Sequence, residues 1–345
     1  MTLPRRVLLW LLFFLICGSL GYPTLNRYDP AKTTGTSDVA VYRDIVMGGQ
    51  PRSVAEDRDP ITRLANSENY YRVLVPYTAK PVYWLAKGRV HSWDPALLGL
   101  LIANAFFTAT TASLLVRVGQ RLGFKHSTAL FAAALYLLNF AVPNLNLVGL
   151  IDSGEGLFVM AVVWSLLTGR WFFLPLWGVL GALAKETFAP LSTLFVVGWW
   201  FAGAQQEQRH YSRLFWVGAM ALTSLTTVFI ALSTVAGGWV WPWSFAGSMG
   251  GCVGLLAGLR ECIFDHTFWY IFVWLLPLGI LRLRRLPSPW VLASGTAFGG
   301  ALLLGAYNNA GGNAARALFN VAGPILSLST AIFLAGPDNE TTQTQ

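Results

Sequence analysis

Asp38 has the surroundings expected of a catalytic base. Within residues 36–49, Val41 and Ile45 are four positions apart, so they share one face of a predicted helix that begins near Asp38. A surface carboxylate is ionised at neutral pH and can accept the proton of an attacking hydroxyl group. The alternative is structural, with Ser37 or Asp38 only capping the helix.

Asp152 and Glu155 form a second acidic group, in a segment that joins two apolar runs. They are three positions apart, so the two side chains can share a face. Acidic groups at a membrane boundary are costly to bury, which makes them a functional-site hypothesis by default. A solvated turn with a helix N-cap is the alternative.

Basic side chains that could bind a phosphate interrupt the later apolar sequence. Lys185 and Glu186 are adjacent, so on a helix they would not face each other and need not neutralise one another. Arg316 opens the last apolar run, where its planar fork of donors could hold a phosphate. Arg260 is a weaker candidate in the Trp-rich region that follows Gly237. Lys185 could instead snorkel to the interface, and Arg316 could be an interfacial anchor.

An aromatic segment, residues 70–84, carries four tyrosines and a tryptophan. Residues of these types are enriched where a membrane meets water. The segment therefore either rests on the membrane surface or binds a substrate there.

The elements that must position these residues are membrane helices. The chain is 54% hydrophobic and 12% charged, whereas soluble domains carry about 25% charged residues. Apolar runs of roughly 15–25 residues recur, the length that crosses a bilayer. We expect an all-α polytopic bundle of about ten transmembrane helices. The expected spans cover residues 7–20, 95–118, 128–150, 156–168, 171–184, 188–202, 214–235, 268–281, 290–307 and 317–334.

Basic residues between the spans give the expected orientation. The net charge of +8 is explained by Lys and Arg in cytoplasmic loops, so nucleic-acid binding is excluded. We expect a signal anchor over residues 1–21, an extracytoplasmic loop with short amphipathic helices over 22–94, the multi-span bundle over 95–336, and a disordered cytoplasmic tail over 337–345. The cytoplasmic connections are too short for a nucleotide-binding domain, which favours a donor that is dissolved in the membrane.

The three cysteines suggest at most one disulfide. Cys17 lies in the first apolar run. Cys252 and Cys262 lie in an expected outer loop, where a disulfide could persist. A helix between them would hold them too far apart to bond, so both states stay open.

The order of these motifs resembles the GT-C class of integral membrane glycosyltransferases, near the enzymes that use polyprenyl-phosphate-mannose. It consists of a signal anchor, Ser37-Asp38-x-x-x-Tyr42 in a long first outer loop, the Asp152/Glu155 segment, Gly-x-Leu-Ala-Lys185-Glu186, and Arg316 before the last span. The resemblance implies that Asp38 is the catalytic base. It also implies an acid of the second outer loop at Asp152 or Glu155, and lipid-phosphate contacts at Lys185 and Arg316.

The resulting hypothesis is a transfer of a sugar from a polyprenyl-phosphate donor to a glycan, lipid or protein acceptor at the outer face of a bacterial inner membrane. Asp38 would be the base. The substrate- and phosphate-binding residues would be Lys185, Arg316, Tyr42, Glu186 and Arg260. A divalent metal, Mg²⁺ or Mn²⁺, is a further expectation at Asp152 and Glu155. The rival hypotheses are a lipid or polysaccharide transporter and a non-catalytic membrane subunit of a cell-envelope complex.

Overall fold

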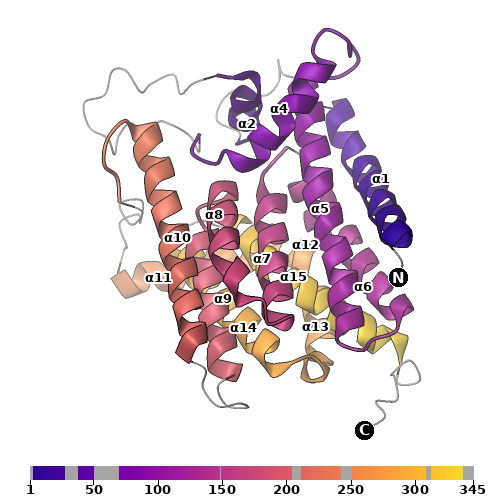
Figure 1. The fold of residues 1–345 in the computed structure, drawn as a ribbon, viewed down its shortest axis with the longest axis vertical. Coiled ribbons are helices and arrows are strands. Elements are labelled where there is room, and N and C mark those ends of the chain that lie inside the picture. The colour runs from indigo at the N-terminus through magenta and orange to yellow at the C-terminus, as the bar shows by residue number, and fades with distance from the viewer. Residues whose placement is uncertain are drawn as a thin grey trace.

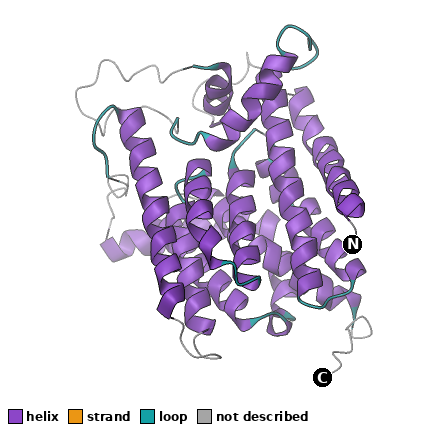
Figure 2. Cartoon of the chain, viewed as in Figure 1, coloured by secondary structure: helices purple, strands orange, loops and turns teal. Residues whose placement is uncertain are grey.

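The chain folds as a bundle of helices. The computed structural model describes residues 3–27, 38–49, 70–147, 149–203, 211–241, 251–307 and 312–336. The described residues form helices and connecting turns without a β-strand, so the all-α expectation is confirmed (Figure 2). The α-helices are α1 (Leu3–Arg27), α2 (Asp38–Met47), α4 (Leu74–Ala86), α5 (Pro95–Arg121), α6 (His126–Leu138), α7 (Asp152–Leu167), α8 (Leu174–Ala184), α9 (Phe188–Gly203), α10 (Tyr211–Ala236), α11 (Gly251–Phe264), α12 (His266–Phe272), α13 (Leu275–Ile280), α14 (Ser288–Tyr307) and α15 (Gly312–Ala335).

Five helices of the described chain are long and apolar enough to cross a membrane. They are α1, α5, α10, α14 and residues Ala314–Ala335 of α15. Three further apolar segments are shorter: His126–Leu138, Trp171–Ala184 and Phe188–Gly203. The lengths and composition support a membrane-embedded helical bundle. The ten spans expected from the sequence are not confirmed.

Two expected spans are interrupted. The run over residues 128–150 was expected to be one helix, but α6 ends at Leu138 and a π-helical turn, η1 (Val142–Asn146), follows. Buried Asn139 explains the interruption, because its backbone is extended and its side-chain amide donates to the carbonyl of Ile271 at 3.0 Å. The expected span 268–281 is likewise divided, into α12 and α13.

Central and peripheral helices differ in how much apolar surface they bury. In the most apolar window of α15, 89% of the residues are buried within the protein, and in α5 72% are. In α1 and α10 the shares are only 17% and 22%. Figure 1 shows α1 and α10 on opposite flanks of the bundle. Their apolar residues therefore face outward, as expected for helices that contact lipid.

Helix α2 matches the sequence prediction for the segment around Asp38. It begins at Asp38 and buries Val41 and Ile45 on one face, together with Tyr42 and Val46. Figure 1 shows α2 and α4 lying across one end of the bundle, next to the beginning of α5.

An ion pair fastens α2 to the bundle. The Arg43 Nε lies 2.7 Å from the Asp94 Oδ2. The other carboxylate oxygen of Asp94 caps α5, since it accepts hydrogen bonds from the backbone N–H groups of Ala96 at 2.9 Å and Leu97 at 3.1 Å. Asp94 thus joins the helix that carries Asp38 to a membrane-length helix.

Several expectations concern segments that the structure describes only in part. The first helix continues to Arg27, beyond the expected boundary at residue 21. Residues 28–37 and 50–69 of the predicted outer loop, and the tail over 337–345, lie outside the described residues. The side chain of Cys252 also lies outside them, so the bonded and unbonded states of Cys252 and Cys262 both stay open.

Candidate functional site

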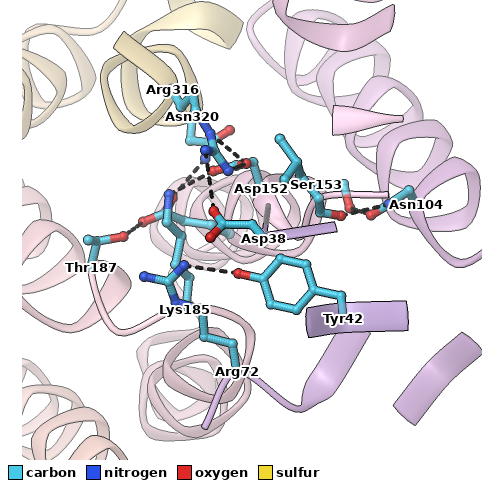
Figure 3. Close-up of polar contacts among 12 residues, drawn as sticks. Asp38, Tyr42, Arg72, Asn104, Asp152, Ser153, Lys185, Thr187, Arg316 and Asn320 are labelled. Carbon is cyan, nitrogen blue, oxygen red and sulfur yellow. Dashed lines mark hydrogen bonds and ion pairs between the residues drawn. The ribbon is translucent and has the colours of Figure 1, made fainter. Parts of the chain in front are cut away.

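Asp152 lies at the centre of a buried cluster of charged side chains (Figure 3). Its side chain is fully buried at the beginning of α7. The Lys185 Nζ donates to the Asp152 Oδ1 at 2.7 Å. The Arg316 Nε donates to the Oδ2 at 2.9 Å, and the Arg316 Nη2 donates to the same oxygen. One buried carboxylate thus connects α7 with the end of α8 and the beginning of α15.

Glu155 continues this cluster one helical turn later, on the same face of α7. Its Oε1 accepts a hydrogen bond from the Thr187 hydroxyl at 2.7 Å. Its Oε2 accepts one from the Asn320 Nδ2 at 2.8 Å and lies 3.5 Å from the Lys185 Nζ. The positive end of the helix dipole also favours acidic groups in the first turn of α7. The alternative of a solvated turn is therefore wrong, because both acids are buried and bonded.

Small residues allow α7 to begin in this crowded position. A Cβ on Gly154 would lie 2.9 Å from Val75 and 3.0 Å from Ala184, so α4 and α8 can approach only because no side chain is present. The neighbouring Ser153 hydroxyl donates to Asn104, whose amide donates in turn to the Leu150 carbonyl at 2.8 Å. These bonds hold the first turn of α7 against α5.

Lys185 reaches Asp152 because the chain breaks between α8 and α9. Lys185 follows the last residue of α8 in an extended conformation, with φ −161° and ψ 134°. Because the backbone is extended here, the side chains of Lys185 and Glu186 point in different directions. Lys185 binds Asp152, and Glu186 binds Arg72. The prediction that the pair need not neutralise itself is confirmed. The snorkelling alternative is wrong, since Lys185 is buried.

Asp38 is the accessible carboxylate of the group. Its Oδ2 lies 3.9 Å from the Arg316 Nη1, and 33% of its side chain is exposed. The buried Asp152 holds the other two nitrogens of the same guanidinium. Figure 3 shows Asp38 directed toward this cluster from α2. Arg316 is therefore a bridge between the buried network and the exposed acid, and not only an interfacial anchor.

A second ion pair lies beside Asp38. The Arg72 guanidinium donates to both carboxylate oxygens of Glu186, from Nε at 2.7 Å and also from Nη2. The remaining Nη1 donates to the Tyr42 hydroxyl at 2.9 Å. Burial opposes ionisation of Glu186, but the charge and hydrogen bonds of Arg72 outweigh it and hold the pKa of this carboxyl below its usual value. Burial raises the pKa of the Tyr42 hydroxyl, which stays neutral.

The residues present do not fit a divalent metal between Asp152 and Glu155. Each of their carboxylate oxygens already accepts a hydrogen bond from a protein donor, and the positive charge of Lys185 lies between the two groups. A metal would have to displace these donors and would be repelled by them. Among the described residues, no group of three His, Cys, Asp or Glu side chains is placed to hold a metal.

The structure brings most of the predicted site residues together. Asp38, Asp152, Glu155, Lys185 and Arg316 form one connected group. Tyr42 and Glu186 form a second group, in which Arg72 binds both. Arg260 is exposed on α11 and is not among the described members of this network.

Sequence reasoning missed Arg72, Thr187 and Asn320. Arg72 lies in the aromatic segment, whose tyrosines predict either a position on the membrane surface or a substrate-binding role without singling out Arg72. The available signal was a lone Arg among apolar residues, the same signal that identified Arg316. Asn320 falls inside the last apolar run, four positions after Arg316 and so on the same helix face.

Comparison with known proteins does not identify a family or a function for this site. No protein-family model, curated protein or solved structure matches the chain.

Proposed function

We propose that the chain is a membrane glycosyltransferase of GT-C type, which transfers a sugar from a polyprenyl-phosphate donor to an acceptor hydroxyl on the extracytoplasmic side of a bacterial inner membrane. One observation carries the proposal. A partly exposed carboxylate, Asp38, lies 3.9 Å from a guanidinium that a buried acid holds in place, Arg316 on Asp152. A base and a fixed cation are the two groups that this transfer requires.

The chemistry assigns one role to each group. The Asp38 carboxylate accepts the proton of the acceptor hydroxyl while that oxygen attacks the anomeric carbon. The bond between this carbon and the phosphate oxygen breaks, with inversion, and the lipid phosphate leaves with the bonding electron pair. Arg316 stabilises the negative charge on the departing phosphate. Lys185 acts through Asp152, because it fixes the carboxylate that orients Arg316.

A groove beside the cluster suits the apolar part of such a donor. It has a volume of about 560 Å³ and lies between the end of α2, the aromatic segment and α10. Its lining includes three tyrosines of the aromatic segment and apolar side chains of α10: Tyr70, Tyr71, Tyr77, Ile230, Ala231 and Val235. The guanidinium carbon of Arg72 lies 5.5 Å from the centroid of the Tyr71 ring, so a wall residue of the groove contacts the ion pair of Arg72 and Glu186. This supports a substrate-binding role for the aromatic segment.

The transporter hypothesis finds less support. A transporter needs polar groups through both halves of the membrane, because its substrate must cross. Along α7, the residues from Gly156 to Trp164 are apolar. The polar cluster is therefore confined to the end of α7 at which that helix begins.

The test is a transfer assay on membranes that contain the Asp38→Asn variant. Membranes are incubated with radiolabelled polyprenyl-phosphate sugars, and labelled product is counted. Loss of a well-placed general base should reduce the rate by about 10²–10⁴-fold, with unchanged insertion and unfolding temperature. Glu261→Gln, the neutralisation of an exposed acid on α11 outside the groove and the cluster, is the control and should retain activity within a few fold. Full activity of Asp38→Asn contradicts the proposal, as does chemical labelling that places Asp38 on the cytoplasmic side.

A further inference from the structure

A second cavity lies near the other end of α7, away from the Asp38 cluster. It has a volume of about 230 Å³, and three arginines line it: Arg6, Arg117 and Arg121. Trp164 forms part of its wall. Asp152 and Trp164 both belong to α7, and their sequence separation corresponds to about 18 Å along the helix axis. The cavity is therefore distinct from the site described above.

The arginines of this cavity keep their charge available. In the part of the chain that the structure describes, none of the three lies within ion-pair distance of a carboxylate. Each guanidinium has five N–H donors and no acceptor. All three side chains are exposed, so water screens part of their mutual repulsion. Like charges around one cavity nevertheless favour a bound anion. The cavity thus has the electrostatics of an anion site.

Two details show that the cavity is more than a cluster of surface charges. The Arg117 guanidinium carbon lies over the Trp164 ring, 4.5 Å from its centroid, so a cation–π contact holds this side chain at the cavity wall. The Ser113 Oγ is buried, lines the cavity and has no hydrogen-bond partner in the described structure. Ser113 precedes Arg117 by one helical turn, so the two side chains share a face of α5. An unsatisfied buried hydroxyl is costly, and a bound oxygen would satisfy it.

The general preference of basic residues for the cytoplasmic ends of spans explains only part of this arrangement. That preference accounts for the presence of Arg6, Arg117 and Arg121 near helix ends. It does not require an arginine to stack on a tryptophan or a hydroxyl to be buried without a partner. A specific ligand accounts for all three observations.

We propose that this cavity binds the phosphate group of an anionic membrane lipid. Arg6, Arg117 and Arg121 would hold the phosphate oxygens with charge-assisted hydrogen bonds, and the Ser113 hydroxyl would donate one more. The apolar part of the wall, Leu9 and Val116, would contact the start of the acyl chains. The cavity is smaller than the roughly 300–1,000 Å³ of sites for drug-sized molecules, which favours a lipid headgroup over a nucleotide. Basic pockets between membrane helices bind such headgroups.

The test is native mass spectrometry of the purified full-length protein in detergent. It is titrated with phosphatidylglycerol, with phosphatidylcholine of the same acyl chains, and with soluble glycerol phosphate. We expect phosphatidylglycerol to bind at least about tenfold more tightly than either other probe. Arg117→Gln should weaken that binding about tenfold, and Ser113→Ala should weaken it a few fold. Arg284→Gln, the same change at an exposed arginine outside the cavity, should leave it unchanged.

Unfolding temperatures separate lost binding from lost folding. Ser113→Ala removes one buried hydroxyl and should fold as well as the wild type. Equal affinities for phosphatidylglycerol and phosphatidylcholine would overturn the proposal, as would equal weakening by Arg284→Gln. Glycerol phosphate binding as tightly as the lipid would show that a soluble phosphate, and not a lipid, is the ligand. None of these results bears on Asp38, so this inference and the proposed function can fail independently.

Discussion

The two ends of α7 handle charge in opposite ways. At its beginning, Asp152 and Glu155 are buried and every carboxylate oxygen is bonded to a protein donor. Near its end, Arg117 and Arg121 border a cavity without a carboxylate partner among the described residues. Paired charges hold elements of the fold together, whereas unpaired charges remain available to a ligand. Substitutions at the first end should therefore cost much stability, and substitutions at the second end should cost little when no ligand is bound.

The largest expected effect on stability is that of Asp152→Asn. The substitution leaves Lys185 and Arg316 without their shared anion, and breaking a buried ion pair in this way costs about 3–5 kcal/mol. Thermal unfolding in detergent, followed by loss of the monodisperse peak, measures the change. Glu261→Gln, an exposed neutralisation on α11, is the control and should change stability by less than about 0.5 kcal/mol. An unchanged unfolding temperature for Asp152→Asn would contradict the structural role assigned to the charges at the beginning of α7.

A smaller loss is expected from the ion pair between Arg72 and Glu186. Glu186→Gln removes a charge-assisted, two-pronged interaction and should cost about 1–3 kcal/mol. The effect is smaller than that of Asp152→Asn because 26% of the Glu186 side chain is exposed. A double-mutant cycle with Arg72→Gln should give a coupling of about 0.5–3 kcal/mol. Additive effects would show that the pair does not act as a unit.

The same pair should make stability depend on pH in the acid range. The folded-state pKa of Glu186 is depressed, so its contribution is present above the usual carboxyl pKa of about 4.3. It is lost as the pH falls through the lower folded-state value. When the pH is lowered from 7 to 3, the unfolding temperature of the wild type should therefore fall further than that of the Glu186→Gln variant. Parallel curves for the two proteins would contradict the assigned pairing.

The smallest change in stability is expected at the arginine cavity. Without lipid, Arg117→Gln should change the free energy of unfolding by no more than about 1 kcal/mol, because it removes the contact with the Trp164 ring and breaks no ion pair in the described structure. Unfolding of delipidated protein in a zwitterionic detergent measures this. A loss as large as that of Asp152→Asn would mean that both ends of α7 are structural.

The sequence predicts the membrane-type helices and the identity of most charged groups in the cluster. Charged residues at the ends of apolar runs are costly to bury at a membrane boundary, so Asp152, Lys185 and Arg316 stand out by their positions alone. The sequence does not predict which of these charged residues pair with each other. Arg316 and Asp152 are 164 residues apart in sequence, and only the packing of α15 against α7 brings them together.

The parts that sequence reasoning missed depend on tertiary context. Arg72 lies among tyrosines, and nothing local shows that Glu186 lies opposite it. In the sequence, Asn139 looks like any single polar residue that a membrane span tolerates. In the structure, its hydrogen bond to the Ile271 carbonyl accompanies the end of α6. From the sequence, Arg117 and Arg121 are interpreted only as basic residues between spans that indicate the orientation of the chain. Their spacing does not reveal the cavity or the contact of Arg117 with Trp164.

Asp94 links the position of α2, which carries the accessible Asp38, to the position of α5. One carboxylate oxygen of Asp94 caps the first turn of α5, and the other forms an ion pair with Arg43, which lies five positions after Asp38 on α2. A tilt or lateral shift of α5 would therefore be transmitted directly to α2. The distance between Asp38 and Arg316 would then respond to bilayer thickness, because a membrane-length helix adjusts its tilt to the lipid around it.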